Sequence, residues 1–105
     1  MKVRVRRVRG VSLALLVLVG SSACGPVGYV GGVVREAGRA VVEAEQAGAR
    51  RAAPYEWTAA LLYLEEARTL AGYARWQEAL AMGRRSAALA RSATARARRS
   101  PAESR

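Results

Sequence analysis

Small apolar residues recur at steps of three and four from residue 33 onward, and most of them are alanine. This spacing is typical of amphipathic helices, and charged residues occupy most of the positions between. The sequence contains no Phe and no Ile. Because alanine favours helix but contributes little buried area, we expect an all-α fold held by closely packed helices.

Proline and glycine divide this region into three predicted helices. Pro54 fits the first turn of a helix but not its interior, so one break falls near Ala52 and Ala53. Gly72 is a natural helix end. We predict a helical domain over residues 33–99, with helices over residues 33–51, 54–71 and 75–98, and a disordered tail over residues 100–105.

The third predicted helix carries a seam of mostly small residues on one side. At 100° per residue this side collects Trp76, Ala79, Gly83, Ser86, Ala90, Ala93 and Ala97. Small residues let helix backbones approach closely. The second helix supplies larger side chains, Trp57, Leu61 and Leu64, that can fill the interface. We therefore expect a short, repeat-like three-helix unit built on a tight antiparallel hairpin.

The predicted domain is small for a single core. Fewer than 70 residues remain once the segments on either side are set aside, and many are alanine. A chain of this size gains little from one core. We expect either marginal stability as a monomer or self-association through the second and third helices.

The first 23 residues have the features of a secretion signal. A basic segment in residues 1–10 precedes an apolar run in residues 11–19, and small residues follow up to Ala23. About nine apolar residues are too few to span a bilayer, which needs roughly 20 in a helix. We predict that residues 1–23 are a cleaved signal peptide.

Ser22, Ala23 and Cys24 resemble the processing site of bacterial lipoproteins, although Ser21 stands where that family usually has Leu. The resemblance implies cleavage between Ala23 and Cys24 and acyl chains on the cysteine. Two alternatives stay open: a soluble secreted chain, because Ser21 and Ala23 also fit a small-x-small site, and an uncleaved anchor. All three place the functional part outside the cytoplasm. Residues 24–32, rich in glycine, are predicted to form a flexible tether.

The composition excludes several kinds of chemistry. The chain has no His, Asp or Asn and a single Cys, so the usual metal-ligand sets and Ser-His-Asp or Cys-His arrangements cannot form. Glu65 and Glu66 would point about 100° apart on a helix, so they cannot act as a paired acid and base. We expect a non-enzymatic protein with no metal, cofactor or small-molecule substrate.

Arginines dominate the C-terminal part of the chain. The net charge is +10, but five positive charges lie in the leader, and residues 24–105 hold 13 Arg and 8 Glu. Arg84, Arg91 and Arg98 are seven residues apart and fall on one helical stripe. This stripe is either a solvated face or a binding site for acidic lipid or cell-wall polymer. A translocated protein rarely meets nucleic acid, so we expect no nucleic-acid partner.

Two family resemblances concern the helical region. The stretch Ala53, Pro54, Tyr55 and Glu56, followed by spaced alanines up to Ala90, resembles a family of short, alanine-rich bacterial envelope lipoproteins that carry a domain of unknown function. A weaker resemblance is to a single tetratricopeptide repeat: Ala67 lies where that motif has a small residue, and residues 76–80 resemble the start of its second helix. Gly83 and Ser86 fit poorly, because the motif prefers an aromatic residue and an alanine at these positions.

These observations predict a structural or protein-interaction module that is held in the cell envelope by acyl chains on Cys24. Its expected partners are the membrane and either an envelope protein or a second copy of the chain. Gly25, rather than Asp, follows the cysteine. By resemblance to lipoprotein sorting, this favours the periplasmic face of the outer membrane in a host with two membranes. The alternative function is anion binding through Arg84, Arg91 and Arg98.

Overall fold

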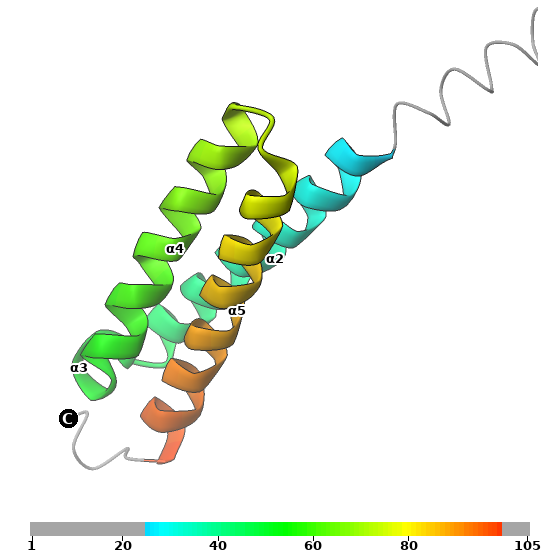
Figure 1. The fold of residues 1–105 in the computed structure, drawn as a ribbon. Helices are drawn as coiled ribbons and strands as arrows, with labels where there is room; N and C mark the ends of the chain where they lie inside the picture. The colour runs from blue at the N-terminus through cyan, green and yellow to red at the C-terminus, as the bar shows by residue number, and fades with distance from the viewer. Residues whose placement is uncertain (1–24, 100–105) are drawn as a thin grey trace, which may run out of the picture.

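The computed structural model describes residues 25–99, and these residues form four helices joined by short turns (Figure 1). The helices are α2 (Pro26–Gln46), the single turn α3 (Ala49–Ala52), α4 (Pro54–Gly72) and α5 (Trp76–Arg99). No strand occurs within residues 25–99, so the predicted all-α fold is confirmed. The predicted signal peptide, Cys24 and the predicted tail over residues 100–105 lie outside the described residues.

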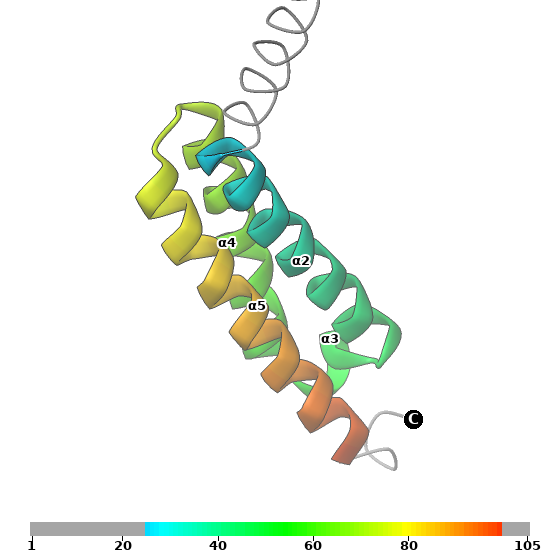
Figure 2. The same cartoon turned by 90° about the vertical axis from the view of Figure 1, so that its right-hand side faces the viewer.

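The three long helices pack as a bundle (Figures 1 and 2). Helices α4 and α5 form the antiparallel hairpin: the Ser86 hydroxyl of α5 donates a buried hydrogen bond of 2.7 Å to the Ala60 carbonyl of α4. Helix α2 runs parallel to α5 and contacts it at Gly83, where a Cβ would lie 3.1 Å from the Val33 side chain. The chain therefore runs up, down and up again.

Helix α2 begins earlier than the sequence predicts. We expected a tether over residues 24–32 and a helix from residue 33, but the helix starts at Pro26, and Gly28, Gly31 and Gly32 lie inside it. Glycine disfavours helix by about 1 kcal/mol per residue. Burial of Val30, which is 2% exposed and packs against Leu70 and Ala79, outweighs this preference. The prediction of a tether is wrong for residues 26–32.

The first predicted helix also ends differently. We expected it to continue to residue 51, but α2 ends at Gln46, and α3 forms a separate turn after Gly48. Gly48 has a φ of 84°, in the left-handed region that suits glycine. The amide of Gly48 donates to the Glu45 carbonyl at 3.0 Å. The chain thus reverses at Gly48 rather than at Pro54 alone.

The predicted boundaries of α4 agree with the structure to within one residue, but the stop signal lies elsewhere. Gly72 is the last helical residue, whereas Ala74 carries the left-handed φ of 59°. The amide of Arg75 donates to the Leu70 carbonyl at 2.9 Å, and that of Ala74 to Ala71 at 3.0 Å. These bonds form a Schellman motif, with alanine in the position that glycine usually holds.

Alanine makes up most of the core. The predicted seam of α5 is buried from Ala79 to Ala97, and Trp76 at its start is half-buried. The seam packs against buried alanines of α2 and α4 and against Leu64, which is 4% exposed. A second, smaller cluster of Val30, Leu70 and Ala79 lies near the α4–α5 turn. The small residues allow the close helix approach that the sequence predicts.

Candidate functional site

The three arginines of the predicted anion-binding stripe all contact side chains of α2. Arg84 donates to the Tyr29 hydroxyl at 2.8 Å, and Arg98 to a Glu43 carboxylate oxygen at 3.1 Å. Between them, Arg91 forms an ion pair with Glu36. Each partner lies 55 residues before its arginine, so two series with the same seven-residue spacing face each other across parallel helices. We call these three contacts the α2–α5 ladder.

The ladder changes the interpretation of the arginine stripe. Two of its three guanidinium groups already face a carboxylate, which lowers their attraction for an external anion. The ion-paired side chains are all more than half exposed, and such surface pairs contribute between about 0 and 1 kcal/mol each to stability. As in coiled coils, pairs of this kind fix the register and orientation of two helices.

Three further ion pairs occur among the described residues. Arg96 reaches Glu56 at 3.0 Å and joins α5 to α4. Arg50 pairs with Glu45 at 3.0 Å and lies 4.7 Å above the Trp57 ring. These contacts, like the ladder, serve packing between helices rather than an open charged site.

The third of these pairs lies at the start of α5, outside the bundle core. Arg75 donates to the Glu78 carboxylate at 2.7 Å and lowers the pKa of that exposed carboxyl. Because the pKa is lowered in the folded chain, this contact stabilises above the usual carboxylate range. It is lost as the pH falls through the lowered value.

The adjacent carboxylates of Glu65 and Glu66 do not form a paired acid and base. Glu65 and Glu66 are both exposed on α4, and the Thr69 hydroxyl donates to the backbone carbonyl of Glu65 rather than to its carboxylate. Within residues 25–99 no group of three or more His, Cys, Asp or Glu side chains could hold a metal ion.

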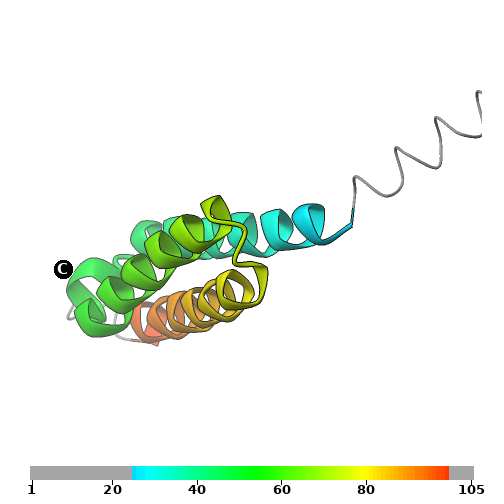
Figure 3. The same cartoon turned by 45° about the horizontal axis from the view of Figure 1, so that its top comes forward.

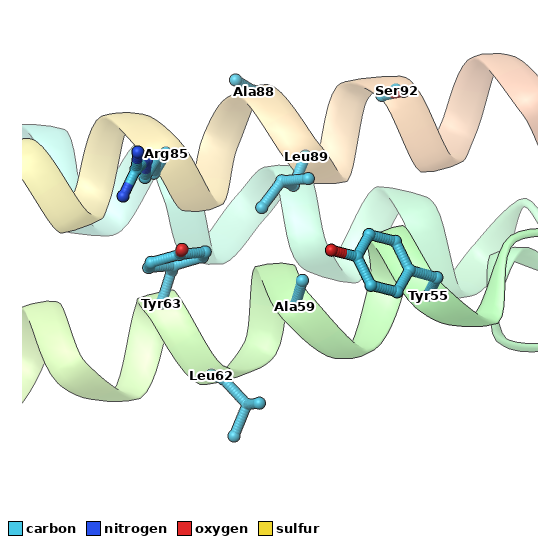
Figure 4. Close-up of a pocket in the computed structure, with 8 residues that line it drawn as sticks. All are labelled: Tyr55, Ala59, Leu62, Tyr63, Arg85, Ala88, Leu89 and Ser92. Atoms are coloured by element: carbon cyan, nitrogen blue, oxygen red, sulfur yellow. The ribbon is translucent and has the colours of Figure 1, made fainter.

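An open groove of about 620 Å³ runs along the outer side of the α4–α5 hairpin (Figure 4). We call it the hairpin groove. Its apolar and aromatic lining comes mainly from α4, whose Tyr55 is 78% exposed and whose Leu62 is 63% exposed. The full lining consists of Tyr55, Ala59, Leu62, Tyr63, Arg85, Ala88, Leu89 and Ser92. No residue of α2 contributes to it.

A cation–π contact lies at one end of the hairpin groove. The Arg85 guanidinium lies 5.5 Å from the centre of the Tyr63 ring, so the ring bridges the gap between the helices (Figure 4). Leu89 is half-buried beside it, while Leu62 points outward from α4. The groove thus has an apolar floor and a single positive charge at one edge, which suits an amphipathic partner.

Sequence reasoning did not single out this groove. Leu61, Leu62 and Tyr63 are consecutive in the second predicted helix, and three consecutive helical residues cannot all face one core. Leu61 is partly buried against the core, and Leu62 is exposed. This excess of apolar residues on the second helix is the signal that could have indicated a second apolar face.

The predicted lipidation and cleavage residues, Ala23 and Cys24, lie outside the described residues. No helix within residues 25–99 combines the length and the apolar character that crossing a membrane requires. Comparison of the chain with protein-family models, curated proteins and solved structures finds no match. The resemblances to envelope lipoproteins and to a tetratricopeptide repeat therefore stay predictions.

Proposed function

We propose that this chain is a non-enzymatic interaction module of the bacterial cell envelope, anchored by acyl chains on Cys24, which binds a protein helix in its hairpin groove. The observation that carries the binding part is the exposed apolar lining of that groove on a face that α2 leaves open. An amphipathic helix laid between α4 and α5 would cover Leu62 and Leu89 and complete a four-helix arrangement.

The anchor part rests on the leader and on Cys24. The basic, apolar and small-residue segments in residues 1–23 support export, and the only cysteine of the chain follows them directly. Two or more acyl chains attach a protein to a membrane far more firmly than one. We place the module in the envelope, on the periplasmic face of the outer membrane in a host with two membranes.

Replacement of Cys24 by Ser tests the anchor. We expect the variant to keep the helical circular-dichroism spectrum of the wild type and to move from the membrane fraction to the soluble fraction. Intact mass of the extracted wild type should equal residues 24–105 plus diacylglycerol, with or without a further acyl chain. Quantitative membrane attachment of the Ser variant, or an unmodified wild-type mass, would contradict the anchor.

The hairpin groove is tested by site-specific photocrosslinking in cells. A photoreactive amino acid at Leu62 should give a defined crosslinked product, because this exposed side chain lies at the rim of the groove, where a bound helix would contact it. The matched control is Val42 of α2, which is exposed to a similar extent, 53% against 63%, but lies on another face. We expect several-fold less product from Val42.

Mass spectrometry of the product then identifies the partner. A product of twice the chain mass indicates self-association, and any other mass indicates an envelope protein. The variant Leu62→Glu places a charge in the groove and should abolish a product formed from a crosslinker at Leu89. Equal products from the Leu62 and Val42 positions would exclude the groove as the binding face.

A further inference from the structure

The start of α2 and the α4–α5 turn lie at the same end of the bundle. Figures 1, 2 and 3 all show these two segments together, away from α3. Packing confirms it: Val30, in the second turn of α2, shares a buried cluster with Leu70 at the end of α4 and Ala79 at the start of α5. We call this the proximal end, because it is the end nearest to Cys24 in the chain.

No flexible spacer separates Cys24 from this end. Gly25 is the N-cap of α2, and Pro26 is its first helical residue. Neighbouring Cα atoms are about 3.8 Å apart, so the cysteine backbone is held within two peptide units of a helix that continues to Gln46. Any lipid on Cys24 would bring the proximal end into the headgroup region.

The exposed side chains of the proximal end suit that environment. Tyr73 is 76% exposed, and Tyr29 and Val27 are each 57% exposed, while Trp76 is half-buried beside them. Tyr and Trp favour the membrane–water interface because they combine an apolar ring with a polar group. A groove of about 470 Å³ beside Val27 and Gly31 adds apolar surface between α2 and α4.

The ionised groups at this end do not oppose contact with lipid headgroups. Residues 25–35 and 70–84 contain Arg35, Arg75 and Arg84 but only one carboxylate, Glu78, which Arg75 already pairs with. The long arginine side chains can place their charges among lipid phosphates while their stems cover apolar surface.

We propose that the proximal end rests on the membrane surface, with Tyr29, Tyr73 and Trp76 at headgroup depth, and that the bundle projects end-on from the bilayer. This inference rests on the proposed anchor at Cys24. The 24 residues of α5 then extend about 36 Å from the surface at 1.5 Å per residue. In this orientation the hairpin groove runs along the membrane normal and stays accessible to a partner beside the bundle.

The two tryptophans of the chain report on this orientation, because they lie toward opposite ends. Trp76 begins α5 at the proximal end, whereas Trp57 lies in the first turn of α4 near α3. Since Glu56 pairs with Arg96, the two indoles are separated by roughly 25 Å along the bundle axis. Fluorescence quenching by brominated phospholipid acts only at short range, so it distinguishes them.

The experiment compares single-tryptophan variants of the membrane-extracted protein in vesicles of brominated and unbrominated phospholipid. We expect emission from Trp76, in the Trp57→Phe variant, to be quenched several-fold more than emission from Trp57, in the Trp76→Phe variant. The Trp57 indole nitrogen is buried without a hydrogen-bond partner in residues 25–99, so Phe there removes no hydrogen bond. If the Trp57→Phe variant fails to fold, the quenching of the wild type can be compared with that of Trp76→Phe. The difference then gives the contribution of Trp76.

The outcomes separate the inference from the anchor on which it rests. Equal quenching of the two tryptophans, or stronger quenching of Trp57, in protein that stays bound to vesicles would overturn the end-on orientation and leave the anchor intact. Protein that does not bind vesicles contradicts the anchor. In that case the Cys24 thiol, the only one in the chain, can be coupled to a maleimide lipid, and the same comparison then decides the orientation.

Discussion

Replacing Gly83 by leucine should lower the free energy of unfolding of the bundle by about 3 kcal/mol or more. Gly83 is buried in α5, and a Cβ at this position would already lie 3.1 Å from the Val33 side chain of α2. Leucine adds three further carbons that can be accommodated only by separating the helices. A domain of about 75 residues has a total stability of roughly 4–11 kcal/mol, so we expect the variant to be partly or wholly unfolded.

Two matched variants distinguish overpacking from a general effect of substitution in α5. Ala81→Leu adds the same side chain at an exposed position of the same helix and should change stability by no more than about 0.5 kcal/mol. Gly83→Ala should be close to neutral, because the gain of about 1 kcal/mol in helix propensity offsets a small displacement of Val33. Urea unfolding followed by circular dichroism measures all three. A Gly83→Leu protein as stable as wild type would contradict the observed α2–α5 packing.

The seam of α5 shows how much of the fold was predictable from sequence. Ala79, Gly83, Ser86, Ala90, Ala93 and Ala97 are all buried, as their spacing predicts. The spacing of these small residues is informative because arginines occupy the opposite side of α5. Only the small-residue side can therefore face a core. The hairpin with α4 follows from the same pattern together with the short turn after Gly72.

Long-range packing decided the features that sequence reasoning missed. The glycine-rich start of α2 has low helix propensity and folds as helix because Val30 is buried at the proximal end. The α2–α5 ladder depends on the register between two helices 55 residues apart. Tyr29, Glu36 and Glu43 have the same seven-residue spacing as the three arginines that they contact. This match could not be used as a prediction, because Tyr29 was assigned to a tether and not to a helix.

The hairpin groove was missed for a different reason. Both faces of α4 carry apolar residues, and periodicity alone does not say which face is covered. The structure assigns Leu64 to the core and Leu62 to the groove, two residues apart on the same helix. This pair therefore allows the core and the proposed binding face to be tested separately, with the same chemical change.

Leu64→Ala should destabilise the bundle by roughly 2–5 kcal/mol, whereas Leu62→Ala should change its stability by no more than about 0.5 kcal/mol. Leu64 is 4% exposed and is the largest side chain of the main buried cluster, where the surrounding alanines offer few atoms that could move to fill the cavity. Leu62 is 63% exposed and lies at the rim of the groove, outside the buried clusters. Urea unfolding measures both stability changes, and the yield of the crosslink from Leu89 measures binding at the groove.

The two variants should thus separate folding from binding. Leu62→Ala should fold like the wild type and lose most of the crosslinked product, because truncation removes apolar area that a partner helix would cover. Conservative replacement by Met at the same position should restore much of that product, since it returns a side chain of similar volume. Equal destabilisation by Leu62→Ala and Leu64→Ala would mean that both faces of α4 are packed within the monomer, leaving no open groove for a partner.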